Sequence, residues 1–373
     1  MTGEAGPTLL VSAGEPSGDR HGAALALALR HLAPHLTLEG PGGRAMAEAG
    51  VRLRFPIERL SAIGFAEVLG SVPRHVGLHR SLVADARAGR YRAAVLIDYP
   101  GFHLRLGAAL RRHGVPVLWY VAPQLWAWRP GRLKALRQAA DRVAVTLPFE
   151  PTWFADRGLP TDFVGHPVAE RPWPSRAEAR AALGVTPEGA VLGIFPGIRE
   201  GELARNWPLF RDVARRMLAE GRACQVLVAG TSGGYYPDAS PLVVVRDQPE
   251  LVLAAATAAL VKSGTTTLEA ACTGTPLVCA YRSSRTTYAL AKRLMTVRWI
   301  SLVNLVAGRE VIPEFWHLPV TGDAVATALR PLLDAGSDEH RAQRAGLAQV
   351  RQALGPTGAA ERVAQLAMEL AAR

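Results

Sequence analysis

The feature that most constrains this chain is a series of short, apolar, β-branched runs that alternate with stretches of helical spacing, and the series occurs twice. The runs expected to form strands cover residues 9–13, 37–39, 95–98, 117–121 and 142–146, and then 191–195, 225–229, 242–245, 258–261 and 277–279. Apolar strands interleaved with helices are typical of a parallel sheet covered on both faces. The sequence therefore predicts an α/β protein of two Rossmann-like lobes, with a ligand cleft between their facing strand ends.

A break in this pattern near residues 165–167 marks the boundary between the lobes, because the proline-rich segment 170–175 that follows is typical of a linker. We expect an N-terminal Rossmann-like domain at residues 1–168, a C-terminal one at 169–337 and a charged helical tail at 338–373. The chain is long enough for each lobe to bury its own core. No segment reaches the roughly 20 consecutive apolar residues of a membrane-spanning helix. The first residues do not resemble a secretion signal, so we expect a cytoplasmic protein.

The charge balance is strongly basic, with 43 Lys and Arg residues against 32 Asp and Glu residues and a formal net charge of +11. Such a field attracts anions, which could be nucleic acid, phosphorylated substrates or an anionic membrane leaflet. The three cysteines, Cys224, Cys272 and Cys279, form no CxxC pair, which argues against a disulfide framework and against a zinc site. We expect buried free thiols.

The residues between the first expected strand and the first helix, 14–19, read Gly-Glu-Pro-Ser-Gly-Asp. Glycine allows a sharp turn there, and the free N–H groups at a helix start attract polar or negative ligand groups. The candidate binding residues are Gly14, Glu15, Ser17, Gly18 and Asp19. The spacing is not GxGxxG, so no dinucleotide site is predicted. The alternative is an ordinary turn in which Ser17 or Asp19 caps the helix.

Two charged residues follow apolar strands, one in each lobe. Asp98 ends the run 95–98, and a carboxylate at the carboxyl end of a parallel strand suits a general base if its pKa is raised. The alternative is a cap on the helix that starts near Gly101. Arg199 lies in the segment 195–200, where its guanidinium is placed to meet phosphate oxygens. The alternative there is a surface arginine on a loop.

The segment 262–269 follows the apolar run 258–261, opens a helix and carries the strongest local signal for a binding site. Its hydroxyl groups and glycine, together with the N–H groups of the helix start, could cradle a diphosphate. The candidates are Ser263, Gly264, Thr265 and Thr266. Glu269 could accept hydrogen bonds from ribose hydroxyls. The spacing is not that of a Walker A loop, and the alternative is a well-capped helix.

Asn304 is a polar residue inside an apolar stretch, so it is either satisfied within a core or placed to contact a nucleotide or sugar. Three stretches, 68–80, 119–134 and 282–299, mix aromatic or apolar residues with basic ones, as interfacial membrane contact requires. The alternative for each is a set of core aromatics beside solvated arginines. RNA binding would use similar residues, but no RNP, KH or zinc-finger pattern is present, so no nucleic acid is expected.

From Leu10 to about Pro319 these motifs occur in the order and spacing of one known family. They are SAGEPSGD (12–19), IGFAEVLG (63–70), WAWR (126–129), LPFE (147–150), FVGHP (163–167), FPG-x-R (195–199), KSGTTTLEA (262–270), AYR (280–282) and SL-x-NL-x-AGRE followed by PE (301–314). The chain resembles the lipid-A-disaccharide synthase family. This resemblance implies a GT-B fold and an inverting glycosyl transfer that releases UDP.

The resemblance also implies substrates and residue roles. The donor would be UDP-2,3-diacylglucosamine and the acceptor 2,3-diacylglucosamine 1-phosphate, joined by a β-1,6 linkage. Asp98 would be the essential carboxylate and Arg199 the essential arginine, while residues 263–269 and Asn304 would hold UDP. Arg282, in the AYR match, is counted with the substrate-binding residues. The sequence contains no DxD metal motif, so neither a metal nor a cofactor is expected. We expect peripheral contact with an anionic inner membrane, and a homodimer is left open.

The chain departs from the family's pattern at three places. The family's D-x-P-D-F-N reads Asp98-Tyr-Pro-Gly101-Phe-His103, its P-G-S-R contains Ile198, and its SLPN contains Val303. The first change lies on the acceptor side, so a divergent member acting on another lipid-linked sugar is an alternative. A UDP-sugar epimerase-like enzyme on the same fold and a non-catalytic lipid- or nucleotide-binding paralogue are two more.

Overall fold

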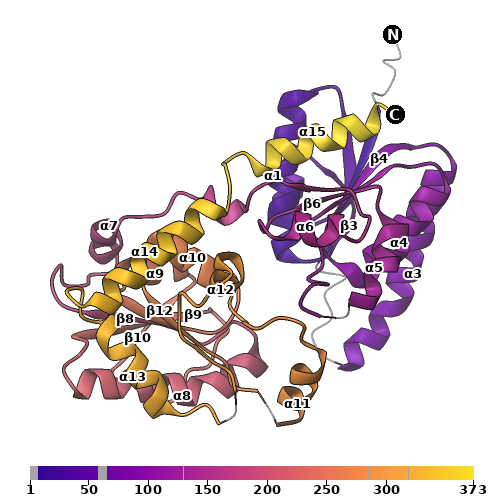
Figure 1. Cartoon of the computed structure of the whole chain (residues 1–373). Coiled ribbons are helices and arrows are strands. Elements are labelled where there is room, and N and C mark those ends of the chain that lie inside the picture. The colour runs from indigo at the N-terminus through magenta and orange to yellow at the C-terminus, as the bar shows by residue number, and fades with distance from the viewer. Residues whose placement is uncertain (1–6, 58–64, 129, 284, 318) are drawn as a thin grey trace. The chain divides into compact units, whose positions relative to one another are not determined.

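The computed structural model describes residues 7–57, 65–128, 130–283, 285–317 and 319–373. It divides the chain into two compact units (Figure 1). Unit 1 comprises Met1–Pro167 and Pro356–Arg373, and unit 2 comprises Val168–Gly355. Each unit is built on a parallel sheet with packed helices, which confirms the predicted α/β class. Within the described ranges, no helix combines the length and the apolar character needed to cross a bilayer.

Unit 1 is built on a seven-stranded sheet in the order β3-β2-β1-β4-β5-β6-β7. Its strands are β1 (Thr8–Ser12), β2 (Thr37–Gly42), β3 (Arg52–Pro56), β4 (Tyr91–Ile97), β5 (Val117–Tyr120), β6 (Arg142–Val145) and β7 (Thr161–Phe163). Its helices are α1 (Pro16–Leu32), α2 (Arg44–Glu48), α3 (Phe65–Arg87), α4 (Pro100–Arg112), α5 (Leu133–Ala139), α6 (Glu150–Ala155) and α15 (Ala359–Ala371). Leu9 and Val11 of β1 enter one core, and Leu10 enters the other. Because both faces are covered, the central strands β1, β4, β5 and β6 are mostly apolar runs.

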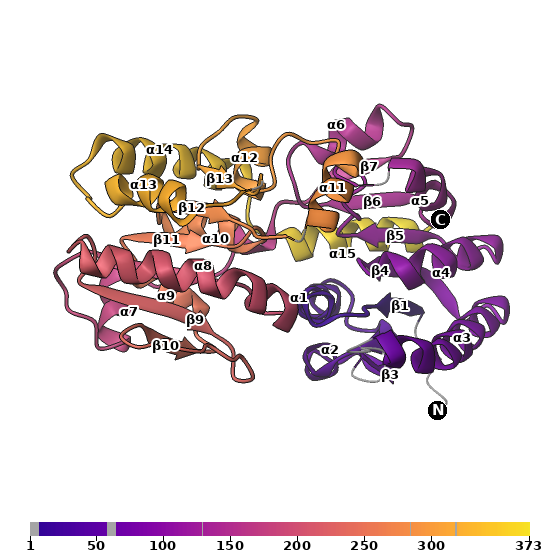
Figure 2. The same ribbon diagram turned by 90° about the horizontal axis from the view of Figure 1, so that it is seen from below.

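The C-terminal helix α15 belongs to unit 1, which differs from the predicted separate tail at 338–373. It packs beside α1, β4 and β5, as Figure 2 shows for the two strands. Its Val363 and Leu370 are buried in the same core as Leu9, and Arg362 donates hydrogen bonds to the carbonyl of Val164. The expected tail is thus divided at Gly355, because the apolar face of α15 completes one face of the first sheet. The units are therefore joined by two chain segments, not by the single expected linker.

Unit 2 is built on a six-stranded parallel sheet in the order β10-β9-β8-β11-β12-β13. Its strands are β8 (Val191–Phe195), β9 (Gln225–Gly230), β10 (Val243–Arg246), β11 (Ala258–Val261), β12 (Leu277–Ala280) and β13 (Glu314–Phe315). Its helices are α7 (Arg176–Ala182), α8 (Glu200–Ala219), α9 (Pro249–Ala255), α10 (Thr266–Thr273), α11 (Arg285–Leu294), α12 (Leu302–Ala307), α13 (Gly322–Leu332) and α14 (Asp338–Ala353). Side chains of α8 and α13 form one core with alternate residues of β8, β9 and β11. Strands β3, β7 and β13 were not predicted.

The three cysteines all lie in unit 2. Cys272 and Cys279 are buried free thiols, as expected, and burial raises the pKa of the Cys272 thiol to about 11. Cys224 is exposed, so this part of the expectation was wrong. The residue precedes β9 at the amino edge of the sheet, where its Sγ lies 3.1 Å from the carbonyl oxygen of Ala190.

The strand order reverses once in each sheet, beside the first strand of the unit. In unit 1 the reversal lies between β1 and β4, and in unit 2 it lies between β8 and β11. In open parallel sheets, ligands bind outside the carboxyl ends of the strands at such a switch point. The turns that follow these four strands contain Gly14, Asp98, Arg199 and residues 262–266, so the topology brings the main sequence candidates to the switch points.

Candidate functional site

The turn that follows β4 holds Asp98 in an unusual backbone conformation. Asp98 has φ 46° and Tyr99 has φ 53°, so two consecutive residues other than glycine occupy the left-handed region. The N–H group of Asp98 donates to the carbonyl of Tyr120, 2.9 Å away at the end of β5. Such residues cost energy and persist only where the surrounding structure holds them, which is common at functional sites. Asp98 is also not the cap of α4, because the N-cap residue is Tyr99.

The carboxyl group of Asp98 has a raised pKa. Burial is the main cause, the negative charge of Glu15 adds to it, and a hydrogen bond from the Tyr99 backbone opposes it, so that the pKa lies at about 6. A carboxyl group with this pKa is mostly ionised at pH 7 and still accepts a proton more readily than an ordinary aspartate. A raised pKa is the condition under which Asp98 would suit the role of a general base.

The turn between β1 and α1 lies against the Asp98 turn. A Cβ atom added to Gly14 would lie 2.2 Å from the ring of Tyr99, so only glycine allows this approach. Glu15 is the N-cap residue of α1, but no side chain caps the helix, so Ser17 is not the cap. Both Glu15 and Ser17 are exposed, whereas Gly18 is buried against Ala13.

Asp19 is the exception among the N-terminal candidates. Its carboxylate accepts hydrogen bonds from the N–H groups of Gly43 at 2.7 Å, Ala45 at 3.0 Å and Met46 at 3.1 Å. It therefore caps the start of α2 rather than α1, and its side chain is buried in that role. The predicted binding role is corrected here, because a carboxylate that already accepts three backbone hydrogen bonds has little capacity left for a ligand.

The turn after β8, residues 196–199, presents a basic group. Gly197 has φ 117°, a backbone conformation that favours glycine. Arg199 occupies the N-cap position of α8, and its side chain is 77% exposed. Its guanidinium lies 3.8 Å from the carboxylate of Glu202. Arg199 is therefore a weakly engaged cation at the switch point of unit 2.

Lys262 is a functional candidate that the sequence reasoning did not select. Its Nζ lies 3.3 Å from Oε1 of Glu202, the same carboxylate that Arg199 approaches. The other oxygen, Oε2 of Glu202, is buried and has no hydrogen-bond partner among the described residues. One carboxylate thus lies near both cations, and Glu200, which follows Arg199, is a second acidic residue in the first turn of α8. The signal in the sequence was the position of Lys262 directly after the apolar strand.

The turn after β11 leads into α10 with its backbone N–H groups available. The hydroxyl of Ser263 donates to the carbonyl of Ile300 at 2.6 Å, so this side chain anchors the turn rather than pointing freely to a ligand. No side chain caps α10. The N–H groups of Gly264, Thr265 and Thr266 donate to no residue that the structure describes. Unused N–H groups at a helix start are suited to bind an anion.

Glu269 and Arg282 both follow this turn in the chain. The side chain of Glu269 has a hydrogen-bond partner, whereas Arg282 is bonded through its backbone. Glu269 accepts a hydrogen bond from Arg171 at 3.0 Å, so a ribose hydroxyl would compete with a guanidinium for it. Arg282 follows β12 and has an exposed side chain, while its backbone N–H donates to Oδ1 of Asn206 at 3.0 Å.

Asn304 is a structural residue, which corrects its predicted role in holding UDP. Its Nδ2 donates to the carbonyl of Ile312 and to the carboxylate of Glu314, and its Oδ1 accepts from the N–H groups of Val311 and Ile312. The side chain is fully buried. An asparagine side chain has two N–H donors and two acceptor lone pairs. All four are used within the protein, so the alternative of a satisfied core residue applies.

Asn206 is a second residue that the sequence reasoning missed. It is fully buried on α8, its Nδ2 donates to the carbonyl of Pro196 at 3.0 Å, and its Oδ1 accepts from the N–H of Arg282. It therefore connects the turn after β8 with the end of β12. The available signal was a polar residue on an apolar helix face, since Leu203 and Phe210 lie three before and four after it.

The departures from the family pattern fall in different environments. Gly101 is exposed with open space around its Cα, and Ile198 is an exposed side chain. His103 and Val303 are fully buried. Only the first two are therefore placed to alter contact with a ligand directly.

The stretches that mix aromatic and basic residues contain both buried side chains, as a core requires, and exposed ones, as membrane contact requires. Trp119 and Trp126 are buried, as the core alternative requires, whereas Trp128 is partly exposed. Trp299 carries Arg298 over its ring at 5.3 Å. Arg129 and residues 58–64 lie outside the described residues, and the side chains of residues 65–72 are not described either. Across the described part of the chain, no three His, Cys, Asp or Glu side chains gather as metal ligands would.

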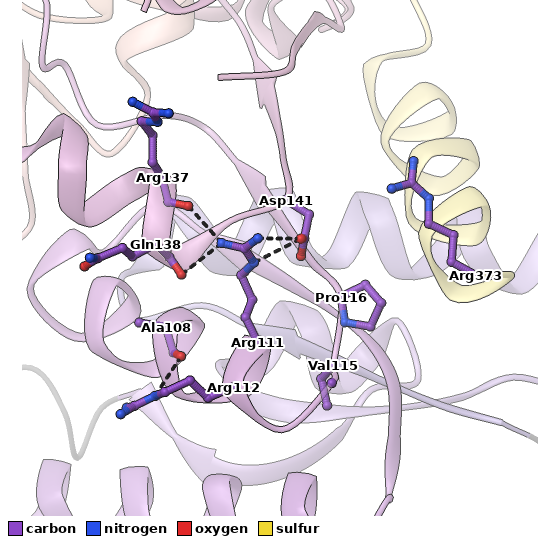
Figure 3. A pocket seen from close by; sticks show the side chains of 10 residues that line it. Ala108, Arg111, Arg112, Val115, Pro116, Arg137, Gln138, Asp141 and Arg373 are labelled. Carbon is purple, nitrogen blue, oxygen red and sulfur yellow. Dashed lines mark hydrogen bonds and ion pairs between the residues drawn. The ribbon is translucent and has the colours of Figure 1, made fainter. Parts of the chain in front are cut away.

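A hollow of about 800 Å³ in unit 1 lies at the opposite edge of the sheet from Asp98. Its lining includes Val115 and Pro116, which precede β5, and Asp141, which precedes β6. Arg111 is bound by Asp141 and by two backbone carbonyls, as Figure 3 shows. The other lining arginines, Arg112, Arg137 and Arg373, do not converge on one point in that view. This hollow is therefore not the candidate site.

Comparison with known proteins agrees with the sequence motifs. A family model described as lipid-A-disaccharide synthetase matches residues 9–369. The lipid-A-disaccharide synthase of Myxococcus xanthus is 39% identical over 375 residues, which cover 98% of this chain and 97% of the relative. That of Geobacter sulfurreducens is 37% identical and covers 99% of both chains.

Solved structures share the fold at much lower identity. MurG of Acinetobacter baumannii has a TM-score of 0.58 at 14% identity, covering 97% of this chain and 99% of that one. A UDP-GlcNAc 2-epimerase from Neisseria meningitidis, bound to UDP-GlcNAc, has a TM-score of 0.62 at 9% identity, covering 97% of this chain and 100% of that one. These likenesses confirm the GT-B fold.

Proposed function

The chain belongs to the lipid-A-disaccharide synthetase family and is a glycosyltransferase, and we propose that it joins UDP-2,3-diacylglucosamine to 2,3-diacylglucosamine 1-phosphate in a β-1,6 linkage. The observation that carries the proposal is the contrast between the two switch points. One holds a half-buried carboxyl group whose pKa lies at about 6. The other holds two cations and a helix start with unused N–H groups. An acceptor hydroxyl needs the first, and a departing diphosphate needs the second.

Asp98 is the general base in the proposed reaction. The oxygen of the acceptor 6-hydroxyl attacks the anomeric carbon of the donor while its proton passes to the ionised carboxylate of Asp98. The bond between the anomeric carbon and the diphosphate oxygen breaks, and UDP leaves with the electron pair. Because attack and departure occur on opposite faces, the configuration at the anomeric carbon is inverted. General-base assistance of this kind contributes about 10²–10⁴-fold to a rate.

The negative charge that develops on UDP is stabilised by residues of unit 2. Arg199 offers a planar guanidinium with little competition, since its side chain is largely exposed and Glu202 is 3.8 Å away. Lys262 adds a second cation. The N–H groups of residues 264–266 point to a ligand role because a helix start favours phosphate oxygens. Preorganised donors of this kind usually make the largest single contribution to lowering a barrier.

We propose that the protein contacts an anionic membrane surface from its cytoplasmic side. Both proposed substrates carry acyl chains, and the formal net charge of the chain is +11. On α3, Val76 is an exposed apolar residue with Arg74 and Arg80 exposed near it in sequence. Trp128 is also partly exposed. Apolar side chains with neighbouring arginines are suited to the headgroup region of a bilayer.

The epimerase alternative rests on the fold alone. Solved UDP-GlcNAc 2-epimerases are similar to this chain at 9–11% identity, which says nothing about the reaction. Curated relatives at 37–39% identity over nearly the full length are named as lipid-A-disaccharide synthases, and this favours the transferase. The non-catalytic alternative depends on the exposed changes at Gly101 and Ile198, and only an assay separates it from the transferase.

The test is an incubation of the purified protein with labelled UDP-2,3-diacylglucosamine in mixed detergent micelles, with and without the phosphorylated acceptor. We expect a disaccharide product by mass spectrometry and stoichiometric UDP, both only when the acceptor is present. Turnover of the donor without acceptor would favour the epimerase-like enzyme. UDP binding without product, across a panel of lipid acceptors, would favour the non-catalytic paralogue.

A further inference from the structure

His103 lies in the first turn of α4, fully buried between the Asp98 turn and β1. Its Nδ1 lies 2.6 Å from the carbonyl oxygen of Asp98, and its Nε2 lies 2.8 Å from the hydroxyl of Ser12. The rings of Tyr99 and Trp119 pack against it edge to face. A single side chain therefore links the turn after β4 with the last residue of β1, the two strands that flank the switch point of unit 1.

The hydrogen bonds assign the proton on this imidazole. A carbonyl oxygen can only accept, so Nδ1 of His103 carries the hydrogen and donates to Asp98. The other nitrogen, Nε2, is then an acceptor, and the hydroxyl of Ser12 donates to it. Burial lowers the pKa of His103 to about 4, so the ring is neutral at pH 7 and this arrangement is stable there.

The backbone of Asp98 is held on both sides. Its N–H donates to the carbonyl of Tyr120, and its carbonyl accepts from His103. Between these two bonds lies a residue with φ 46°, followed by Tyr99 with φ 53°. A left-handed residue other than glycine relaxes unless its neighbours hold it. The same peptide group also donates the Tyr99 N–H to the carboxyl group of Asp98. Removal of the bond from His103 leaves the carbonyl end of this peptide group without its donor, and a change in its orientation displaces the carboxyl group that the Tyr99 N–H holds.

We propose that His103 is a positioning residue for the reaction: through its Nδ1–H group it fixes the carbonyl of Asp98 and so keeps the carboxylate of Asp98 in the orientation that accepts the proton. The inference rests on the proposed function of Asp98 as the base. It gives His103 no contact with substrate, so the effect of a substitution falls on kcat and not on the binding of the UDP-sugar.

Two amide substitutions separate the two hydrogen bonds of His103. In His103→Asn the amide nitrogen takes nearly the place of Nδ1 and keeps the donor to Asp98. In His103→Gln the amide reaches the place of Nε2, keeps a partner for Ser12 and leaves the carbonyl of Asp98 without its donor. We expect kcat to fall about 100-fold in His103→Gln and less than about tenfold in His103→Asn, because a displacement of about 1 Å in a reacting group costs about two orders of magnitude. The KM for the UDP-sugar should change less than twofold in both.

His340 provides a matched control. It is buried in unit 2 on α14, and its Nδ1 lies 2.7 Å from the carbonyl of Leu332. His340→Gln removes an equivalent donor without touching either switch point. It should lower the melting temperature by about as much as His103→Gln, since each change leaves one buried carbonyl unpaired, while kcat stays within about twofold of the wild type. Equal losses of kcat in the two Gln variants, or equal kcat in His103→Gln and His103→Asn, would overturn the inference.

A spectroscopic measurement keeps the inference independent of the assay. Nitrogen-15 NMR of histidine-labelled protein, with His103→Asn used to assign the signal, reports which ring nitrogen carries the hydrogen. We expect His103 to be neutral and protonated at Nδ1 between pH 6 and 8. Protonation at Nε2 would contradict the inference even if the enzyme is active. If the wild type makes no disaccharide but shows the Nδ1–H form, the proposed function fails and the geometric link to Asp98 stands.

Discussion

The switch points of the two units use the same topology with opposite chemistry. In unit 1 the turns are acidic, closely packed and strained, with Asp98 at φ 46° and Glu15 as a second negative charge. In unit 2 the turns are basic, with Arg199 and Lys262 beside a helix start whose N–H groups are unused. A parallel sheet thus supplies only the location. The residues in the turns determine whether that location favours a carboxylate that takes a proton or a set of donors that binds an anion.

The packing of the two turns also differs. Around Asp98, the ring of Tyr99 lies against Gly14, and His103 is buried beneath the turn. Around Arg199, the side chains of Arg199 and Ile198 are exposed, and Asn206 fixes only the backbone below them. A general base has to be held in one orientation before the substrate arrives, whereas a long guanidinium can adjust to a phosphate that binds it. We therefore expect substitutions in unit 1 to affect kcat and substitutions in unit 2 to affect nucleotide affinity as well.

The largest expected effect comes from Asp98→Asn. This change keeps the shape of the side chain and removes its ability to accept a proton, so we expect kcat to fall about 1,000-fold. The affinity for UDP, measured by calorimetry, should stay within about twofold because Asp98 is not part of the nucleotide site. Asp156→Asn, on the exposed end of α6, is the matched control and should retain full activity. Substantial turnover by Asp98→Asn would remove Asp98 as the base.

Arg199→Met tests the switch point of unit 2, where we propose that the diphosphate binds. It removes the guanidinium but keeps an unbranched side chain, and we expect kcat to fall about 100-fold because one donor to a developing oxyanion is lost. In contrast to Asp98→Asn, UDP affinity should also fall, by about tenfold. Arg211→Met, on the same helix and paired with Asp212 and Asp238, controls for the loss of a positive charge from unit 2. Unchanged UDP affinity in Arg199→Met would show that the turn after β8 does not hold the diphosphate.

Asn206→Leu should have a moderate effect on both stability and nucleotide affinity. The change leaves the carbonyl of Pro196 and the N–H of Arg282 unpaired, which costs about 1–3 kcal/mol for each buried group that stays unsatisfied. We expect UDP to bind about fivefold more weakly, because the turn that carries Arg199 loses its anchor. The control is Gln343→Leu on α14, where a buried amide oxygen accepts from the N–H of Leu277 at the amino end of β12. It should lower stability without changing UDP affinity, and an equal loss of affinity in both variants would deny Asn206 its specific role.

The smallest expected effect is a displacement of the pH profile. The pKa of Asp98 is raised to about 6, so kcat/KM should rise with pH through about 6 as the carboxyl group ionises. The negative charge of Glu15 contributes to the raised pKa, so Glu15→Gln should move this acid limb to lower pH and leave the plateau almost unchanged. Glu48→Gln on α2 removes the same charge elsewhere in unit 1 and should leave the limb in place. A limb that moves upward in Glu15→Gln would contradict the assignment.

Local pattern was sufficient to find the residues that directly follow apolar strands. Asp98, Arg199 and the 262–269 segment all lie at positions where an apolar run ends, and parallel topology carries such positions to the sheet edge. Strand β13 was missed because two residues are too short for any periodicity. The cleft between facing lobes and the homodimer remain predictions.

Asp19, which was misassigned, and Asn206, which was missed, both have partners far away in the chain. Asp19 caps a helix that begins 25 residues later, and Asn206 binds a backbone group 76 residues away. Asn304 was ambiguous because a buried amide looks the same in sequence whether a ligand or the chain itself satisfies it. His103 was noted only as a departure from the family pattern, and its hydrogen bonds to Ser12 and Asp98 depend on the tertiary structure.

The return of α15 to the first sheet has a consequence for anyone who wants to produce the units separately. A fragment that stops at Pro167 would expose the apolar surface of β4, β5 and α1 that Val363 and Leu370 cover, and we expect such a fragment to aggregate. A workable expression clone for unit 1 would splice the codons for residues 356–373 behind residue 167 through a short glycine–serine spacer. Unit 2, in contrast, is a continuous stretch from Val168 to Gly355 and could be excised as one piece.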